Sequence, residues 1–438
     1  MKIKVLIFSI LTVLALGAGA FWWLTRPQVI VFSDDSKLTL LGVDYGKRHV
    51  PPTVKVPAST NRASARRSGN GSFTTESNAL VVWFKIQHPP DETRSYHFFI
   101  YDPDGKACTS SENTHRVRNT ERETGMDVIG AEFDAFPRRF GKLLVRAQTW
   151  IPGGSEDIPP KKVRIANPVH ATFPAWNGDP LPATRSDDNL SVTFKEFVTG
   201  VSLSYLRDQD NPDDAVNKAS RVVFHVDSDG KPANNWSVGN YDLYDATGNH
   251  VRGYANNDPP KDGDTAAILP SGLWPGEPWK VRLEFSKKSG YDDSELWTIQ
   301  NIPVTPGREQ DYWSYINRNS RTNVPFAETD RNGIHLKIFG AKQFTDANPN
   351  SDRQGVVVVQ ARPAPKDGWE LVLVGITDAQ TNVVESRSSS SSYDSTMASH
   401  GYGMSDLSGV TNITVTLALH KHRSVEFTVK PSEADPNQ

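Results

Sequence analysis

Two histidines near the C-terminus have the spacing of a pair of metal ligands. His420 and His422 are two residues apart in a segment that alternates apolar and polar residues. On a β-strand this spacing directs both side chains to one face, where two imidazoles can converge on a Zn²⁺ ion. A third ligand would have to come from elsewhere, with His400 and His335 as the candidates. The alternative, which is more frequent in proteins, is a solvated strand face.

Two acidic segments offer oxygen ligands of the kind that Ca²⁺ takes. They are "DQDNPDD" (208–214) and "DSDG" (227–230). Neither fits the 12-residue calcium loop of EF-hands, because Pro212 and Pro232 stand where that pattern needs a ligand and a glycine. Asp and Asn side chains also cap turns without any metal. We therefore assign no calcium ligand from the sequence.

Aromatic side chains cluster in two stretches between the predicted strands. "LWPGEPW" (273–279) and "DYWSYI" (311–316) place Trp and Tyr in loops or connectors. Exposed aromatic faces can stack on sugar rings and often mark binding surfaces. The alternative is packing between adjacent domains, and we expect Trp279 and Trp297, near strand starts, to lie in the core.

Recognisable catalytic motifs are missing from the sequence. The stretch nearest to a nucleophile elbow, "GMSDLSG" (403–409), lacks the second glycine at the required spacing. We find no zinc-protease helix and no phosphate-binding glycine loop. Lys and Arg number 48 against 51 Asp and Glu, which gives no nucleic-acid footprint. We predict no enzyme and assign no catalytic, cofactor-binding or metal-binding residue.

One phrase recurs three times and shows how the chain is organised. "FFIYDPDGKAC" (98–108), "YDLYDATGNHV" (241–251) and "VGITDAQTNVV" (374–384) each lead from apolar residues into a turn that begins with Asp. The second acid of the first copy, Asp104, is Thr247 and Gln380 in the others. A metal site would keep its second ligand, so the phrase indicates a hairpin turn.

Further segments recur around this phrase in the same order and predict a triplicated domain. In each segment apolar and polar residues alternate, as in half-buried antiparallel strands. The segments before the phrase are 36–45 and 80–87, then 189–197 and 220–227, then 333–342 and 355–362; those after it are 142–150 and 279–287 and 412–420, and the closing runs end at Val169, Val304 and Ser432.

Short alternating strands bury their apolar faces by pairing two sheets. In this respect the chain resembles the immunoglobulin-like and fibronectin type III superfold of many bacterial surface proteins. The segment "KLTLLGVDYGKRHVPP" (37–52) is also similar to the first strand of uncharacterised anchored bacterial exported proteins. The single cysteine, Cys108, excludes both an intrachain disulfide and the Cys-Trp-Cys signature of antibody domains. This superfold hosts many functions, so the resemblance implies no mechanism.

The N-terminus predicts export. Lys2 and Lys4 precede an uncharged segment, 5–25, that is long enough to cross a bilayer. Residues 18–20 would also suit cleavage by signal peptidase. We favour an uncleaved anchor, because Phe21 and the two tryptophans after it suit a membrane interface. We expect a single-pass cell-membrane protein whose bulk lies outside the cytoplasm, or an exported chain after signal cleavage.

The predicted fold is all-β, with three tandem immunoglobulin-like antiparallel β-sandwich domains after an N-terminal transmembrane helix. We expect a binding, adhesion or scaffold protein that carries no catalytic centre. A carbohydrate-binding accessory protein and an exported hydrolase with an unrecognised acid site are the alternatives. The partners left open are the membrane, through the N-terminal helix, and a protein or glycan ligand. The expected boundaries are 1–27 for the anchor or signal peptide, 28–169 with a polar insertion at 57–78, 170–305 with a leading connector, and 306–438 with a leading connector and a Ser-rich loop at 386–406.

Overall fold

The chain folds into β-strands almost throughout the computed structural model. Within the described residues, helical backbone is confined to a 3-10 turn at Glu309–Asp311 and one turn over 312–316. The prediction of an all-β chain is therefore confirmed. The described residues are 27–52, 72–87, 95–105, 107–110, 113–117, 126–150, 156–157, 159–202, 218–258, 263–269, 273–274, 276–316, 324–347, 354–365, 368–393, 396–405, 407 and 409–434.

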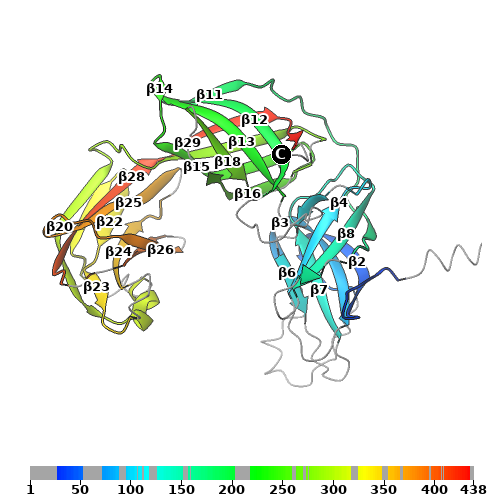
Figure 1. Ribbon diagram of the computed structural model, residues 1–438, viewed down its shortest axis with the longest axis horizontal. Helices are drawn as coiled ribbons and strands as arrows, with labels where there is room; N and C mark the ends of the chain where they lie inside the picture. Colours follow the sequence, from blue (N-terminus) through cyan, green and yellow to red (C-terminus); the bar gives the residue numbers. More distant parts are fainter. Residues whose placement is uncertain are drawn as a thin grey trace, which may run out of the picture.

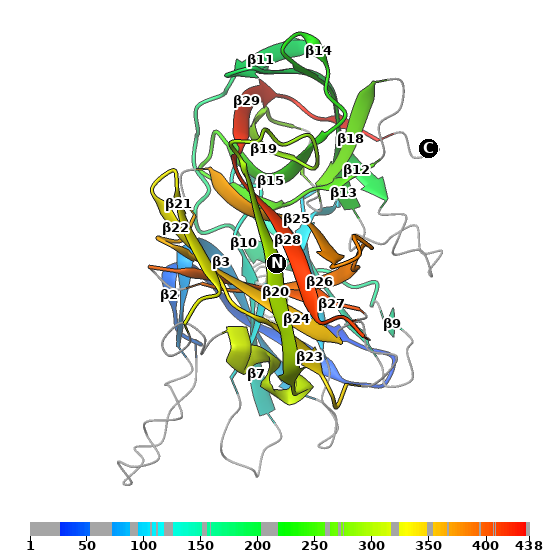
Figure 2. The ribbon, with the colours of Figure 1, turned by 90° about the vertical axis from the view of Figure 1, so that its left-hand side faces the viewer.

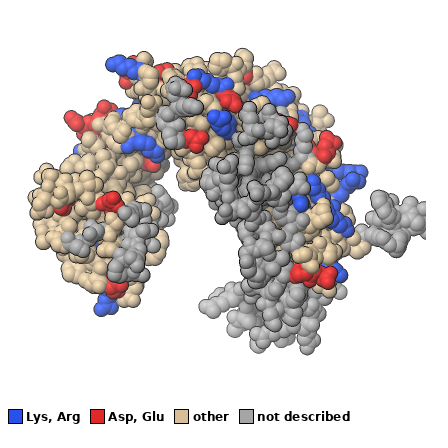
Figure 3. Space-filling model, viewed as in Figure 1, with Lys and Arg blue, Asp and Glu red and all other residues tan. Residues whose placement is uncertain are grey.

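The strands gather into three lobes, which we call units 1, 2 and 3 in chain order. The lobes follow one another along an arch, with the blue and cyan strands of unit 1 at one end and unit 3 at the other (Figure 1). Lys, Arg, Asp and Glu are scattered over the described part of the face in Figure 3, in keeping with a net charge of -3. Unit 2 lies between the other two, so the arch has two joints.

Unit 1 is a pair of antiparallel sheets whose apolar faces meet. Its strands are β1 (Val29–Val31), β2 (Lys37–His49), β3 (Phe73–Gln87), β4 (Tyr96–Tyr101), β5 (Ala107–Ser110), β6 (Asn113–Val117), β7 (Met126–Phe133), β8 (Lys142–Trp150), β9 (Glu156–Asp157) and β10 (Val163–Ala166). The sheet orders are β1-β2-β3-β7-β6 and β10-β8-β4-β5, with β9 beside β8. Phe84 of β3 stacks on Phe98 of β4, with ring centroids 5.0 Å apart. The period-2 pattern thus buries one face of each sheet against the other.

Unit 2 repeats this arrangement. Its strands are β11 (Ala183–Asp187), β12 (Leu190–Ser202), β13 (Lys218–Ser228), β14 (Lys231–Pro232), β15 (Trp236–Asp245), β16 (His250–Tyr254), β17 (Asn256–Asn257), β18 (Asp264–Leu269), β19 (Trp279–Lys287) and, from the C-terminal end of the chain, β29 (Arg423–Val429) and β30 (Ser432–Glu433). The sheet orders are β11-β12-β13-β18-β17 and β16-β15-β19-β29. Phe224 meets Phe285 between the sheets, edge to face at 5.2 Å.

Unit 3 is one continuous nine-stranded sheet that encloses a core of its own. Its strands are β20 (Leu296–Gly307), β21 (Ala327–Arg331), β22 (Ile334–Ile338), β23 (Ala341–Phe344), β24 (Gly355–Arg362), β25 (Trp369–Asp378), β26 (Ser386–Tyr393), β27 (Ala398–Met404) and β28 (Asn412–Lys421). The main order is β21-β22-β24-β23-β20-β28-β25, with β27 also paired to β24 and β26 to β27. The long strand β20 joins the two halves, because it pairs with β28 along its first part and with β23 along its last.

Units 2 and 3 exchange their closing strands. β29, predicted to close the third unit, runs antiparallel to β19 of unit 2 with Phe427 opposite Val281. β20, predicted to close the second unit, runs antiparallel to β28 of unit 3 with Thr298 opposite Thr416. Figure 2 shows the red chain passing from β28 in unit 3 up into β29 in unit 2. Both predicted assignments are wrong, whereas β10 of unit 1 pairs with β8 of its own unit, as expected.

The length of one connection explains why β29 leaves unit 3. A single residue, His422, separates β28 from β29. The shortest common hairpin needs a two-residue loop, so β29 cannot fold back on β28 and continues into the next sheet. The exchange is reciprocal, because β20 and the β29–β30 segment make equivalent contacts. β20 runs antiparallel to β28 and then parallel to β23, which belongs to the opening segment of unit 3. In the same way β29 runs antiparallel to β19, and β30 then runs parallel to β12, the opening segment of unit 2.

The five-segment repeat omits one strand from every unit. β7, β18 and β27 each pair with the second repeated strand of their unit, which is β3, β13 or β24. β27 lies within the predicted Ser-rich loop 386–406, which instead forms the hairpin of β26 and β27. Its small residues permit close packing, since a side chain at Gly401 would meet Ile316 Cδ1 at 2.6 Å. The loop prediction is therefore wrong.

Two predictions near the N-terminal end also need correction. No helix among the described residues is long and apolar enough to cross a membrane, which contradicts the predicted single-pass anchor. The segment 5–25 on which that prediction rested lies outside the described residues. Of the predicted polar insertion 57–78, residues 57–71 are likewise outside, and the strand β3 begins at Phe73.

Candidate functional site

The two histidines with metal-ligand spacing lie at the crossover from unit 3 to unit 2. His420 is near the end of β28, and His422 is the residue that connects β28 to β29. Glu370, on β25, is the direct cross-strand partner of His420. The His422 N–H donates to the carbonyl oxygen of Gly368 at 2.7 Å, which holds the crossover against the start of β25. Antiparallel pairing thus brings a carboxylate to the two imidazoles.

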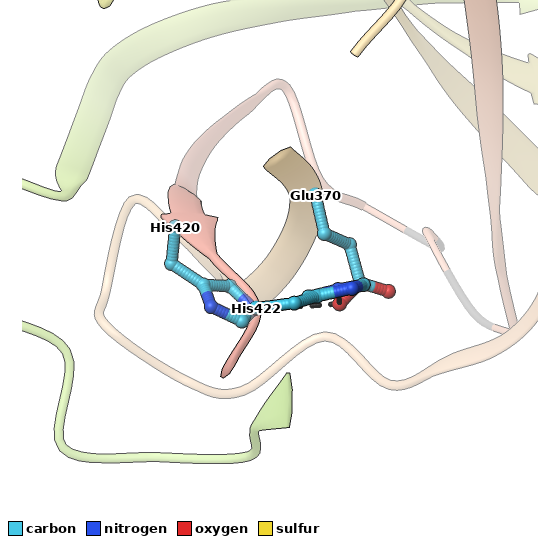
Figure 4. A group of neighbouring side chains, drawn as sticks. All are labelled: Glu370, His420 and His422. Atoms are coloured by element: carbon cyan, nitrogen blue, oxygen red, sulfur yellow. Dashed lines mark hydrogen bonds and ion pairs between the residues drawn. The ribbon is translucent and has the colours of Figure 1, made fainter. Parts of the chain in front are cut away.

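The three side chains point toward one another (Figure 4). His422 Nε2 lies 2.7 Å from Glu370 Oε2, a hydrogen bond, and His420 Nε2 lies 3.3 Å from the same oxygen. One ligand atom from each residue can be chosen so that all three lie within 4.8 Å of one another. Among the described residues this is the one such group of His, Cys, Asp and Glu.

His420 is completely buried, and its surroundings do not satisfy its ring. Its side chain has no exposed surface, and neither ring nitrogen makes a hydrogen bond, despite the 3.3 Å approach to Glu370. The ring of Tyr291 packs against it at 5.5 Å. A buried imidazole without a hydrogen bond costs free energy, so this position is not explained by packing alone.

The electrostatics favour an ionised Glu370. Burial alone would raise the pKa of its carboxyl, but the close approach of His420 and His422 and the charges of both rings outweigh that effect and hold the pKa well below its usual range. Burial also raises the pKa of Tyr291 to about 12, and the charges of Glu370 and Glu295 act in the same direction. Tyr291 therefore keeps its proton, and its hydroxyl donates to the carbonyl oxygen of Lys287 at 2.7 Å.

The sequence identified part of this site. The structure places His420 and His422 together, but His420 is buried, so the solvated strand face is wrong for it. Neither predicted third ligand joins them. His335 contacts Asp330 on the β21–β22 hairpin, and His400 lies on β27 outside the group. Glu370 was missed because its register opposite His420 depends on a long-range strand pairing.

Among the described residues, the other candidate ligands do not gather into a group that could hold a metal ion. Segment 208–214 lies outside the described residues. Of the 227–230 segment, Asp227 is 3.4 Å from His225, and Asp229 accepts a hydrogen bond from Asn189. These contacts belong to the ends of β12 and β13. The described contacts of this second cluster are those of a turn between strands.

The aromatic stretches lie mostly in the protein interior. Trp274 packs edge to face on Trp279 at 4.8 Å, and both are buried. Tyr312 is also buried, whereas Trp313 is 54% exposed. The prediction that Trp279 lies in the core is confirmed, and Trp297 is partly buried against the core of unit 3. Packing, rather than a broad exposed surface, explains most of these residues.

The second copy of the repeated phrase forms the joint between units 1 and 2. Asp245 Oδ1 accepts hydrogen bonds from the N–H groups of Thr247 and Asn249, at 2.9 and 2.8 Å. The Asn249 amide then faces unit 1, where it donates to the Phe136 carbonyl at 2.9 Å and accepts from the Phe136 N–H at 3.2 Å. Arg138 donates to the Thr247 carbonyl at 3.0 Å. Through these hydrogen bonds the turn of unit 2 is attached to unit 1.

The third copy forms the same turn but is exposed. Asp378 Oδ1 accepts from the N–H groups of Gln380 and Asn382, both at 2.8 Å. The hydrogen bonds from Asn382 and the turn hold the pKa of Asp378 below its usual value. The interpretation of the phrase as a turn is confirmed for these two copies. The two copies share one turn geometry, but among the described residues only the second copy contacts another unit. The turn therefore forms whether or not it serves as a joint.

Comparison with known proteins gives no family. No family model matches the chain, and no curated protein matches it. Among solved structures, a marsupial T cell receptor is similar over 79% of this chain and 94% of that chain, with 9% identity and a TM-score of 0.12. A score this low carries no argument. What stands of the predicted resemblance is the coarser statement that the chain is a set of packed, largely antiparallel β-sheets.

Proposed function

We propose that the chain is a binding or scaffold protein without catalytic activity, and that its role depends on the fixed arrangement of three immunoglobulin-like units. An all-β fold of this kind is compatible with such a role. The observation that carries the proposal is the construction of the joints. Units joined only by flexible linkers would move independently, but here both joints consist of paired or buried groups.

Support at the first joint comes from a shared core and specific hydrogen bonds. One cluster of buried apolar residues is continuous through units 1 and 2. The Asn249 amide bonds to Phe136 of unit 1, and Arg139 of unit 1 lies 2.7 Å from buried Glu277 of unit 2. Buried, satisfied polar groups specify one arrangement of their partners. We expect this joint to hold a single angle.

Support at the second joint comes from the exchange of strands. The chain crosses between units 2 and 3 twice, and each unit is completed by a strand attached to the other. Arg423, at the start of β29, pairs with Asp188 of unit 2 at 2.6 Å, which helps to hold the exchanged strand in that unit. Bending at this joint strains two connections at once, so a scaffold gains stiffness without a large side-chain interface.

Small-angle X-ray scattering of the full chain tests the proposal. A scaffold with fixed joints should give a scattering curve that a single arch reproduces. The matched pair Asn249→Ala and Asn382→Ala should differ, because only Asn249 bridges two units. We expect a larger maximum dimension for Asn249→Ala and no change for Asn382→Ala. A wild-type curve that requires a broad ensemble of unit orientations would overturn the proposal.

A carbohydrate-binding role has narrower support. It rests on Trp313, whose ring is exposed beside buried Tyr312 near the start of unit 3. A single exposed ring can stack on a sugar but offers little area for selective binding. A glycan array probed with the full chain and with Trp313→Ala decides the matter. Glycan binding that the substitution abolishes would support this alternative, and no binding would exclude it.

A further inference from the structure

We propose that Glu370, His420 and His422 bind one divalent transition-metal ion, with Zn²⁺ as the best fit, where the chain crosses from unit 3 into unit 2. This goes beyond the proposed scaffold function, because it assigns a ligand to a particular set of side chains. The inference rests on three observations: the donor atoms, their spacing, and the buried ring of His420.

The donor set selects the class of ion. Two imidazole nitrogens and one carboxylate oxygen suit zinc and other first-row transition metals, whereas Ca²⁺ and Mg²⁺ favour oxygen ligands alone. Zinc bonds of about 2.0–2.2 Å at tetrahedral angles place neighbouring ligand atoms about 3.3 Å apart. Glu370 Oε2 lies 3.3 Å from His420 Nε2 and 2.7 Å from His422 Nε2. Small side-chain adjustments therefore suffice.

The burial of His420 supplies the independent observation. Its imidazole has no exposed surface and no hydrogen bond at either ring nitrogen. A purely structural position would favour an apolar ring there, because burying an unsatisfied polar group is costly. A metal bond to Nε2 removes that cost at the nitrogen that faces Glu370. His420 thus has the burial and orientation of a ligand.

A second shell of groups would orient the site and link it to unit 2. Glu284 of β19 lies 3.9 Å from His422 Nδ1, the ring nitrogen opposite the one that faces Glu370. Carboxylates in this position commonly fix the orientation of metal-bound histidine. The Glu370 side chain is 41% exposed, which leaves room for water as a fourth ligand. The ion would clamp the crossover, because its ligands come from β25, β28 and the connecting residue.

Metal binding by the purified full chain, without a histidine tag, tests this assignment. We expect equilibrium dialysis to give one tightly bound Zn²⁺ per chain, and Co²⁺ to give the visible absorption of a low-symmetry, nitrogen-coordinated site. Ca²⁺ and Mg²⁺ should not compete. Saturating Zn²⁺ should raise the Tm by about 5 °C, since a ligand that binds only the folded state stabilises it. Absence of the single tight site in the folded chain would overturn the proposal.

Variants locate the bound ion. Glu370→Gln and His422→Ala change partly exposed side chains and should weaken Zn²⁺ binding at least about 100-fold, because even outer-shell changes cost about 10–100-fold. Glu284→Gln should cost about 10-fold. His335→Ala is the matched control, because His335 also contacts carboxylates but lies outside the group. Unchanged binding in both Glu370→Gln and His422→Ala would contradict the assignment, and their folding is checked by circular dichroism.

Discussion

The two joints of the arch hold neighbouring units together in different ways. Unit 1 keeps its own closing strand, β10, and shares with unit 2 a continuous apolar core, fixed by side chains such as Asn249. Units 2 and 3 have separate apolar clusters but trade β20 for β29. The first joint therefore depends on side-chain chemistry and can be weakened by one substitution. The second depends on the path of the main chain, and a residue placed in one unit's sequence repeat stabilises the other.

The largest effect should come from the exchanged strand at the C-terminus. Phe427 is buried in unit 2, where its ring lies 4.9 Å from that of Phe194. Phe427→Ala should lower the free energy of unfolding by about 3–5 kcal/mol, because it leaves a cavity in that core. Hydrogen exchange should accelerate in β12, β13 and β19 and stay slow in β22 and β24. Accelerated exchange confined to unit 3 would show that β29 closes its own repeat.

The reciprocal change sharpens the same comparison. Ile302 of β20 is buried in unit 3, and Ile302→Ala should cost about 2–5 kcal/mol. Here the faster hydrogen exchange should appear in β24 and β28, and β13 should be unaffected. Ile165→Ala, in the closing strand of unit 1, is the control for a strand that is not exchanged, and it should affect unit 1. Faster hydrogen exchange in unit 2 of the Ile302→Ala variant would contradict the exchange of strands.

A smaller effect is expected at the joint made by side chains. Asn249→Ala removes both hydrogen bonds to Phe136 and leaves that buried N–H and carbonyl unpaired. We expect a loss of about 1–3 kcal/mol, measured by denaturant unfolding, with faster hydrogen exchange near Phe136. Asn382→Ala, at the equivalent exposed turn, should have little effect. Equal effects at the two positions would mean that the turn, and not the joint, carries the stability.

The smallest expected effect is the contribution of the Asp242 carboxylate to stability, which is lost at low pH. Burial raises the pKa of Asp242, but the hydrogen bonds and charges of His250 and Arg252 outweigh this and hold its pKa below the ordinary value. A depressed pKa stabilises the fold fully above about pH 4, and this contribution is lost as the pH falls through the folded-state pKa. Asp242→Asn should therefore cost about 1 kcal/mol at neutral pH, because both partners are partly exposed.

The pH dependence separates this from a packing effect. The difference between wild type and Asp242→Asn should shrink below about pH 4, as the wild-type carboxyl becomes protonated. Denaturant unfolding from pH 7 to pH 3 measures it. Unit 3 has Gly375 at the corresponding position of β25, so the effect should be confined to unit 2. A constant difference across this range would exclude the charge of Asp242 as the cause.

Local patterns made most strands predictable and left their partners open. Alternation located β8, β19 and β24 at their observed bounds, because half-buried strands carry a period of two. β27 escaped detection, since one of its two faces is formed by Ser399, Gly401 and Gly403, which give the strand little apolar–polar alternation. The strand exchange could not be predicted, because the closing segments have nearly the same pattern in all three repeats. Only the one-residue connection at His422 distinguishes β29 in the sequence.

The candidate site was half predictable for the same reason. The spacing of His420 and His422 is local, so it could be recognised without knowledge of the fold. Glu370 is opposite His420, 50 residues away in the chain, only because β25 pairs with β28 in one register. Strand register at such separation is set by core packing and by neighbouring strands. Burial of His420 depends in turn on the crossover.

Disulfide trapping tests the exchange of strands most directly. In a Cys108→Ala background, cysteines replace Arg282 and Glu426 in one variant, and Thr298 and Thr416 in another. These pairs are directly opposite on β19 and β29, and on β20 and β28. We predict that both variants form intramolecular bridges in the folded monomer, identified by peptide mass spectrometry. Bridges that fail to form, or that form only between two chains, would contradict an exchange within one molecule.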